Sequence, residues 1–138
     1  MSGVLGRLSG VRRLEDSTIE ELEAEAEKIE WRCVVLDGAE VEDRESFLQM
    51  CDEAFGLPDW FGMNWDALEE CLLDLDLGED EGVLVVWASW GLLAEAEPKA
   101  FATALDILGG AVRGWAQDGV RGGVVLLGDG PEIDVDEL

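Results

Sequence analysis

Three carboxylates stand close together in one short segment of the chain. Asp66, Glu69 and Glu70 have the i, i+3, i+4 spacing that places side chains on one face of a helix. Like charges at this spacing destabilise a helix by about 0.2–0.5 kcal/mol per pair. The helix therefore either tolerates the three carboxylates as a solvated face or presents them to a basic partner. Its opposite face carries an apolar stripe of Leu68, Cys71, Leu72 and Leu75.

Two aromatic residues stand just before this helix. Trp60 and Phe61 lie between Pro58 and Gly62, which predicts a loop. We interpret Phe61 as a lid on the core, whereas a loop tryptophan beside an acidic helix has the character of an interface anchor. Together, the aromatic loop and the carboxylates form a patch that can imitate the bases and phosphates of RNA.

Catalytic interpretations have little support. The chain has no histidine, so the commonest general base and metal ligand are missing. Its paired glycines form neither a GxGxxG fingerprint nor a P-loop. Paired carboxylates can hydrolyse glycosides, but pairs are uninformative in a chain with 33 acidic residues. We predict that the protein is not an enzyme and uses no cofactor and no metal.

The three cysteines point to a reducing environment. Cys33, Cys51 and Cys71 are widely spaced, odd in number and without a CxxC pair. This pattern argues against a disulfide framework and against a thiolate metal site. We expect reduced cysteines in a cytoplasmic protein, and no stretch reaches the roughly 20 apolar residues of a membrane span.

The charge is strongly one-sided. Acidic residues outnumber basic ones by 33 to 9, for a formal net charge of −24, and no lysine or arginine lies between Arg44 and Lys99. Solubility alone is normally served by interspersed signs, so the long acidic stretch favours an acidic surface. Such a protein is repelled by nucleic acid and by anionic membranes, and it attracts basic proteins.

The carboxylates and the aromatic loop must be held in place by helices and strands. Three unbroken apolar runs separated by helical patterns predict an α/β fold with a three-stranded parallel sheet packed with helices. The expected strands are 33–36, 83–87 and 122–127, and the expected helices are 43–55, 64–75 and 98–115. Asn64 is the expected N-cap of the acidic helix.

The two ends of the chain are expected to differ from this central part. Residues 1–16 show little periodicity and predict a flexible arm, followed by a charged helix to residue 30 with a capping box from Ser17 to Glu20. The acidic tail after Gly128 is expected to fray. We therefore divide the chain into an arm and N-terminal helical extension (1–31), a central domain (32–128) and an acidic tail (129–138).

At the acidic helix the sequence resembles a known family. The segment Leu57-Pro58-x-Trp60-Phe61-Gly62-x-Asn64-x-Asp66-Ala67-Leu68-x-x-Cys71-Leu72 is similar to the signature of the barstar family, and the likeness extends over roughly residues 32–128. The resemblance implies a barstar-like sheet covered by helices. It also implies inhibition of a basic microbial ribonuclease of the barnase-like type, for self-protection or as a bacterial immunity protein.

The resemblance also assigns roles to residues of the signature. It implies that Trp60 packs on the nuclease, that Asp66 is the first inhibitory aspartate, and that Glu70 enters the phosphate site of the nuclease. Glu69 occupies the position beside it, where the founding member has a tryptophan. The implied contact loop also contains Gly62 and Asn64.

One family contact has no counterpart here. The family carries a further carboxylate late in the long helix, where this chain has Gly114 and where Asp118 is the nearest acid. The partner thus need not be barnase itself. We expect a monomer when the protein is free. An alternative stays open, in which the same fold serves as an acidic interaction module whose partner is not a nuclease.

Overall fold

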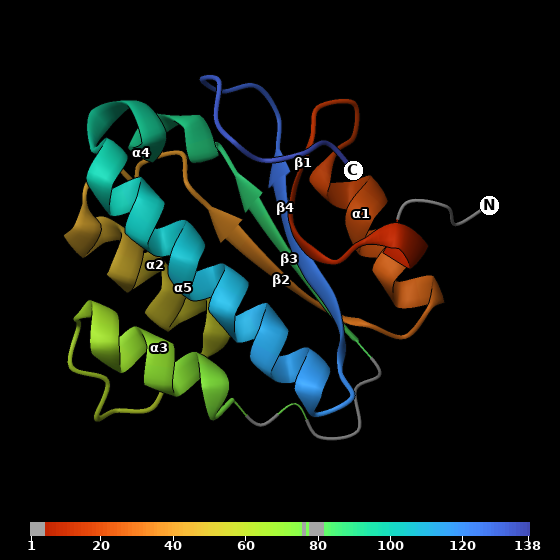
Figure 1. Cartoon of the computed structure of the whole chain (residues 1–138), viewed down its shortest axis with the longest axis horizontal. Coiled ribbons are helices and arrows are strands. Elements are labelled where there is room, and N and C mark those ends of the chain that lie inside the picture. Colours follow the sequence, from red (N-terminus) through yellow and green to blue (C-terminus); the bar gives the residue numbers. More distant parts are fainter. Residues whose placement is uncertain (1–4, 76, 78–81) are drawn as a thin grey trace.

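The computed structural model describes residues 5–75, 77 and 82–138, and it is built around a parallel sheet (Figure 1). The sheet has four strands in the order β1-β4-β3-β2, and every pairing is parallel. The strands are β1 Gly10–Leu14, β2 Arg32–Asp37, β3 Gly82–Ala88 and β4 Arg121–Leu127. The predicted α/β class with a parallel sheet is confirmed, but the prediction of three strands is wrong.

The additional strand, β1, comes from the segment expected to be a flexible arm. It pairs with β4, so that Val11 lies opposite Val124. The apolar pattern of β1 is interrupted by two arginines, which concealed it. Arg13 is nevertheless buried, with its guanidinium 5.0 Å from the ring centre of Trp90. A long cationic side chain that stacks on an aromatic ring can occupy a buried strand position.

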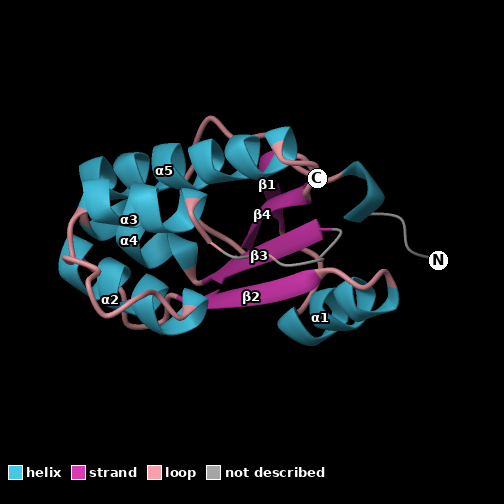
Figure 2. Cartoon of the chain, turned by 90° about the horizontal axis from the view of Figure 1, so that it is seen from below, coloured by secondary structure: helices cyan, strands magenta, loops and turns pink. Residues whose placement is uncertain are grey.

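Helices cover both faces of the sheet (Figure 2). The helices are α1 Ile19–Lys28, α2 Arg44–Phe55, α3 Trp65–Leu73, α4 Trp90–Ala96 and α5 Pro98–Gln117, with a short 3₁₀ turn at Leu5–Arg7. The predicted helices at 43–55, 64–75 and 98–115 are confirmed with small changes at their ends. The short helix α4 was not predicted.

Successive side chains of β3 point to opposite faces of the sheet, and each face is covered by its own hydrophobic core. Val83 and Val85 face the larger core, which α2, α3, α4 and α5 complete. Leu84 and Val86 face the smaller core, which includes Leu22 of α1. The larger core is the one that supports the acidic helix.

Side-chain caps mark where α1 and α2 begin. The N-cap of α1 is Thr18, whose hydroxyl accepts from the Glu21 N–H at 3.1 Å, so the cap lies one residue later than the predicted Ser17. Asp43 caps α2 in a capping box with Ser46 and accepts the Ser46 N–H at 2.8 Å. The α2 helix ends at Gly56, whose φ of 63° favours glycine.

The C-terminal tail is bonded to β1 instead of frayed. The Arg13 N–H donates to the Asp136 carbonyl at 2.9 Å, and the Leu138 N–H donates to the Arg13 carbonyl at 2.8 Å. The tail therefore covers the outer edge of β1. The division of the chain at residues 31 and 128 stays a prediction.

The described cysteines are all free thiols, as expected. Cys51 and Cys71 are buried, and burial raises the pKa of the half-buried Cys33 thiol to about 11. Across the described part of the chain, no helix is both long and apolar enough to cross a bilayer.

Candidate functional site

The loop before α3 directs its two aromatic side chains in opposite directions. Phe61 is 8% exposed and packs in the larger core, and its N–H donates to the Pro58 carbonyl at 2.9 Å. Trp60 is 63% exposed and points outward. The tight turn anchored by Phe61 thus presents Trp60 at the surface, as the sequence predicted.

Asn64 joins this loop to α3. Its side-chain oxygen accepts the Ala67 N–H at 2.8 Å, which confirms the predicted N-cap. Its side-chain nitrogen donates to the Gly62 carbonyl at 3.4 Å. One side chain therefore holds both the first turn of α3 and the loop that carries Trp60.

The α3 helix separates its apolar and acidic faces. Leu68, Cys71 and Leu72 are buried, whereas Asp66, Glu69 and Glu70 are exposed. Among the described residues, no ion pair engages any of these three carboxylates. Their charges are therefore available to a partner.

Two contacts fasten α3 to its neighbours. The Trp115 indole of α5 donates to the Leu72 carbonyl at 2.9 Å in a buried position. At the other end of α3, the Trp65 ring lies 5.8 Å from the Phe47 ring of α2. The acidic helix is consequently held at both ends by the core.

Position 114, where this chain lacks the late-helix carboxylate, lies against Leu73 of α3. A Cβ placed at Gly114 of α5 would stand 2.5 Å from a methyl group of Leu73. Any side chain at position 114 therefore requires Leu73 to move. Leu73 itself is 45% exposed and occupies the surface beside this glycine.

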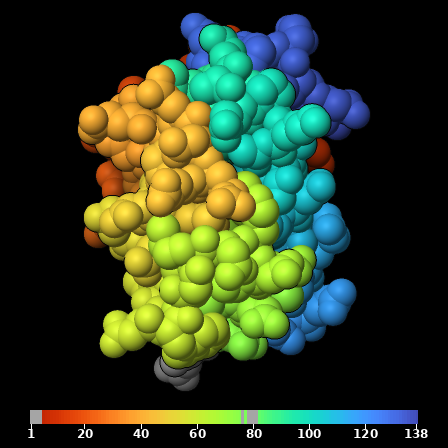
Figure 3. All heavy atoms as spheres, turned by 90° about the vertical axis from the view of Figure 1, so that its left-hand side faces the viewer, coloured from red at the N-terminus to blue at the C-terminus, as the bar shows by residue number. Residues whose placement is uncertain are grey.

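The acidic surface extends from α3 onto α2. Figure 3 shows the two helices side by side on one face of the molecule, with α4 and α5 next to them. Burial raises the pKa of the Cys71 thiol. The nearby negative charges of Asp74, Glu70 and Asp52 raise this pKa further. Carboxylates of both helices thus act on the same place.

Two basic residues lie at the border of this surface, which the sequence did not predict. Arg44 and Lys99, the residues that flank the long acidic stretch, line one hollow of about 470 Å³ together with Trp65. The same hollow is lined by Asp43, Glu45 and Glu97, so acidic and basic side chains meet near the start of α3. The positions of Arg44 and Lys99, 55 apart in the chain, concealed this proximity.

The described residues contain no cluster of histidine, cysteine, aspartate or glutamate that could hold a metal ion. The exposed carboxylates of α3 lie on a helix face instead of in an enclosed cleft. The arrangement is suited to contact with a basic protein surface.

Comparisons with known proteins address the family and the fold. A family model described as Barstar (barnase inhibitor) matches residues 31–126. No curated protein matches the chain. Among solved structures, the chain is similar to the Aeropyrum pernix ORC2 protein in its ADPNP-ADP complexes, with a TM-score of 0.54 and 16% identity. That alignment covers 89% of this chain and 36% of the ORC2 chain, so the likeness concerns the fold of one part of that protein.

Proposed function

This chain belongs to the barstar family, and we propose that it inhibits a basic ribonuclease by covering the active site of the enzyme with α3 and the loop before it. The observation that carries this proposal is the exposed Trp60 beside a helix face with three exposed carboxylates. In a cell that makes such an enzyme, the chain would act as an immunity protein. It performs no catalysis of its own.

The chemistry of inhibition follows from what a ribonuclease must bind. Its active site is concave and carries cationic donors for the phosphates of RNA. Asp66 and Glu70 would accept hydrogen bonds from these donors, and charge-assisted bonds of this kind are short and strong. Neither carboxylate offers the enzyme a phosphodiester to cleave, so the contact blocks the site.

Trp60 would supply the apolar part of the contact. A large aromatic side chain that becomes buried in an interface commonly dominates the binding energy. The tight turn at Phe61 and the Asn64 side chain hold this loop before the partner arrives. Such preorganisation reduces the entropy lost on binding.

The long-range field would speed the encounter. A net charge of −24 attracts a basic enzyme over distances of about a Debye length, roughly 10 Å at 0.1 M salt. We therefore expect electrostatics to act mainly on the association rate.

Competition tests this proposal. A labelled oligonucleotide that cannot be cleaved is bound to barnase, and to a second basic bacterial ribonuclease, and the chain is then added. The proposal predicts displacement of the oligonucleotide from at least one enzyme. Formation of a complex that leaves the oligonucleotide bound would contradict active-site inhibition.

A further inference from the structure

The two edges of the sheet differ in how they are covered. The outer edge of β1 carries the C-terminal tail, which bonds to Arg13 through Asp136 and Leu138. At the opposite edge, β2 pairs with β3 and with no other described strand. An unpaired edge strand exposes backbone donors and acceptors to any strand that can approach it.

The backbone groups that face this open edge can be identified. The Gly38 N–H donates to the Ala88 carbonyl of β3 at 2.9 Å and continues the β2–β3 ladder. In a parallel ladder, alternate residues bond to the same neighbour. The N–H and carbonyl groups of Val35 and Asp37 therefore point away from β3, toward the open edge.

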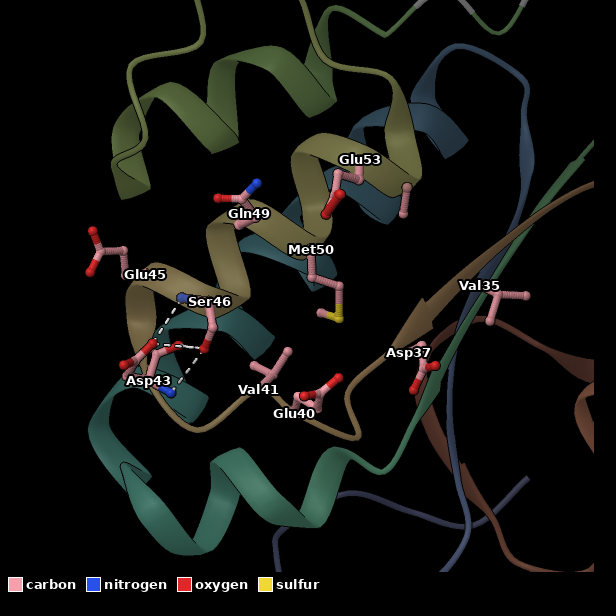
Figure 4. Close-up of a pocket in the computed structure, with 11 residues that line it drawn as sticks. Val35, Asp37, Glu40, Val41, Asp43, Glu45, Ser46, Gln49, Met50 and Glu53 are labelled. Carbon is pink, nitrogen blue, oxygen red and sulfur yellow. Dashed lines mark hydrogen bonds between the residues drawn. The ribbon is translucent and has the colours of Figure 1, made fainter.

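A groove of about 690 Å³ runs beside this edge, between β2 and α2 (Figure 4). One face of α2 forms its far wall, with Ser46, Gln49, Met50, Glu53 and Ala54. These residues span about 12 Å at 1.5 Å per residue of helix. The groove thus has room for about four residues of an extended chain at 3.3 Å each.

The groove is acidic at its rim and apolar inside. Its lining includes five carboxylates and no lysine or arginine: Asp37, Glu40, Asp43, Glu45 and Glu53. Val41 and Met50 are buried at its base. A second copy of this chain would bring like charges together at this edge, so the charge favours a basic occupant.

We propose that the open edge of β2 and this groove bind an extended basic segment of a protein partner. The segment adds as a further strand to β2, which is a recurring mode of peptide recognition. Its lysine or arginine side chains face the rim carboxylates, and its apolar side chains contact Val41 and Met50. Figure 4 draws α3 on the far side of α2, and no residue of the proposed inhibitory surface lines this groove, so the proposal does not depend on that function.

The test uses the full chain and two short peptides of alternating lysine and valine. One peptide is unmodified. The other carries N-methyl groups at alternate residues on its pairing edge, which keep its charge but remove its backbone donors. We expect the N-methylated peptide to bind about tenfold more weakly, because it lacks several backbone hydrogen bonds. We also expect the unmodified peptide to slow amide hydrogen exchange at Val35 and Asp37.

Charge-matched variants locate the site. The double variant with Glu40→Gln and Glu53→Gln should weaken binding of the unmodified peptide by about threefold or more. The Glu20→Gln and Glu132→Gln pair, which removes the same charge at exposed positions elsewhere, should have a smaller effect. Glu70→Gln on α3 should also have little effect, which separates this proposal from the inhibitory one.

Three results would overturn the proposal. Equal affinity for both peptides would mean that charge alone attracts them. Unchanged exchange at Val35 and Asp37 would place the peptide elsewhere. A concentration-dependent dimer in sedimentation equilibrium that protects the same two amides would make a second copy the occupant of this edge.

Discussion

The Trp115 indole N–H donates to the Leu72 carbonyl oxygen across 2.9 Å, in the buried contact between α5 and α3. Leu72 lies in the last turn of α3, and its carbonyl also accepts the Leu75 N–H at 3.3 Å. The long helix thus supplies a second, shorter hydrogen bond to this carbonyl, and it fixes the direction in which α3 presents its carboxylates.

The Trp115→Phe variant tests this connection. It removes the indole donor and leaves the Leu72 carbonyl with only the longer bond from the Leu75 N–H, which costs about 0.5–1.5 kcal/mol. We expect the free energy of unfolding from urea titration to fall by this amount. Trp60→Phe, a change at an exposed tryptophan, should alter it by less than about 0.5 kcal/mol. Equal losses in the two variants would mean that the indole bond contributes nothing specific.

Trp60→Ala separates binding from stability. Because this side chain is exposed in the free protein, its removal should change the free energy of unfolding by less than about 0.5 kcal/mol. In complex with an inhibited ribonuclease, the same change should cost about 2 kcal/mol or more of binding free energy. Calorimetric titration measures the second quantity, and an unchanged Kd would remove Trp60 from the interface.

Ionic strength should act on association more than on dissociation. Raising the salt concentration from 0.05 to 0.5 M (about a tenfold change) shortens the Debye length roughly threefold and screens the attraction between the acidic chain and a basic enzyme. Stopped-flow mixing should show association slowing by tenfold or more, roughly, while the dissociation rate changes little. An association rate that is independent of salt would contradict steering by the charge of the chain.

Acid should weaken the cap of α2. The hydrogen bonds from the Ser46 backbone and side chain lower the pKa of Asp43 below its ordinary value of 3.8. A lowered folded-state pKa means that Asp43 stabilises the fold above pH 3.8, and that this contribution is lost as the pH falls through the folded-state pKa. Asp43→Asn should therefore lower Tm at pH 6 more than at pH 2. The same difference in Tm at both values would contradict the assignment.

The central elements were predictable because their signals are local. Unbroken apolar runs identified β2, β3 and β4, and the Asn64 cap identified the start of α3. The spacing of Asp66, Glu69 and Glu70 likewise placed them on an exposed face. Each of these features depends on residues that are close together in the sequence.

The missed features depend on contacts between distant residues. The β1 strand is concealed by Arg13, whose burial requires the Trp90 ring of α4. The close approach of Leu73 to Gly114 joins α3 to α5, and the hollow at Arg44 requires Lys99 of α5. None of these relationships has a periodicity that the sequence could display.

The most direct test of the inhibitory surface is titration of the chain into a fluorogenic RNA-cleavage assay with barnase and a second basic bacterial ribonuclease. Three proteins are compared: the unchanged chain, Glu70→Gln on α3, and Glu132→Gln in the tail, which removes the same charge away from α3. We predict stoichiometric loss of activity of at least one enzyme with the unchanged chain and with Glu132→Gln. Glu70→Gln should need at least about tenfold more protein, because a buried donor of the enzyme then lacks its charged partner. No inhibition of either enzyme, or equal potency of all three proteins, would contradict the account.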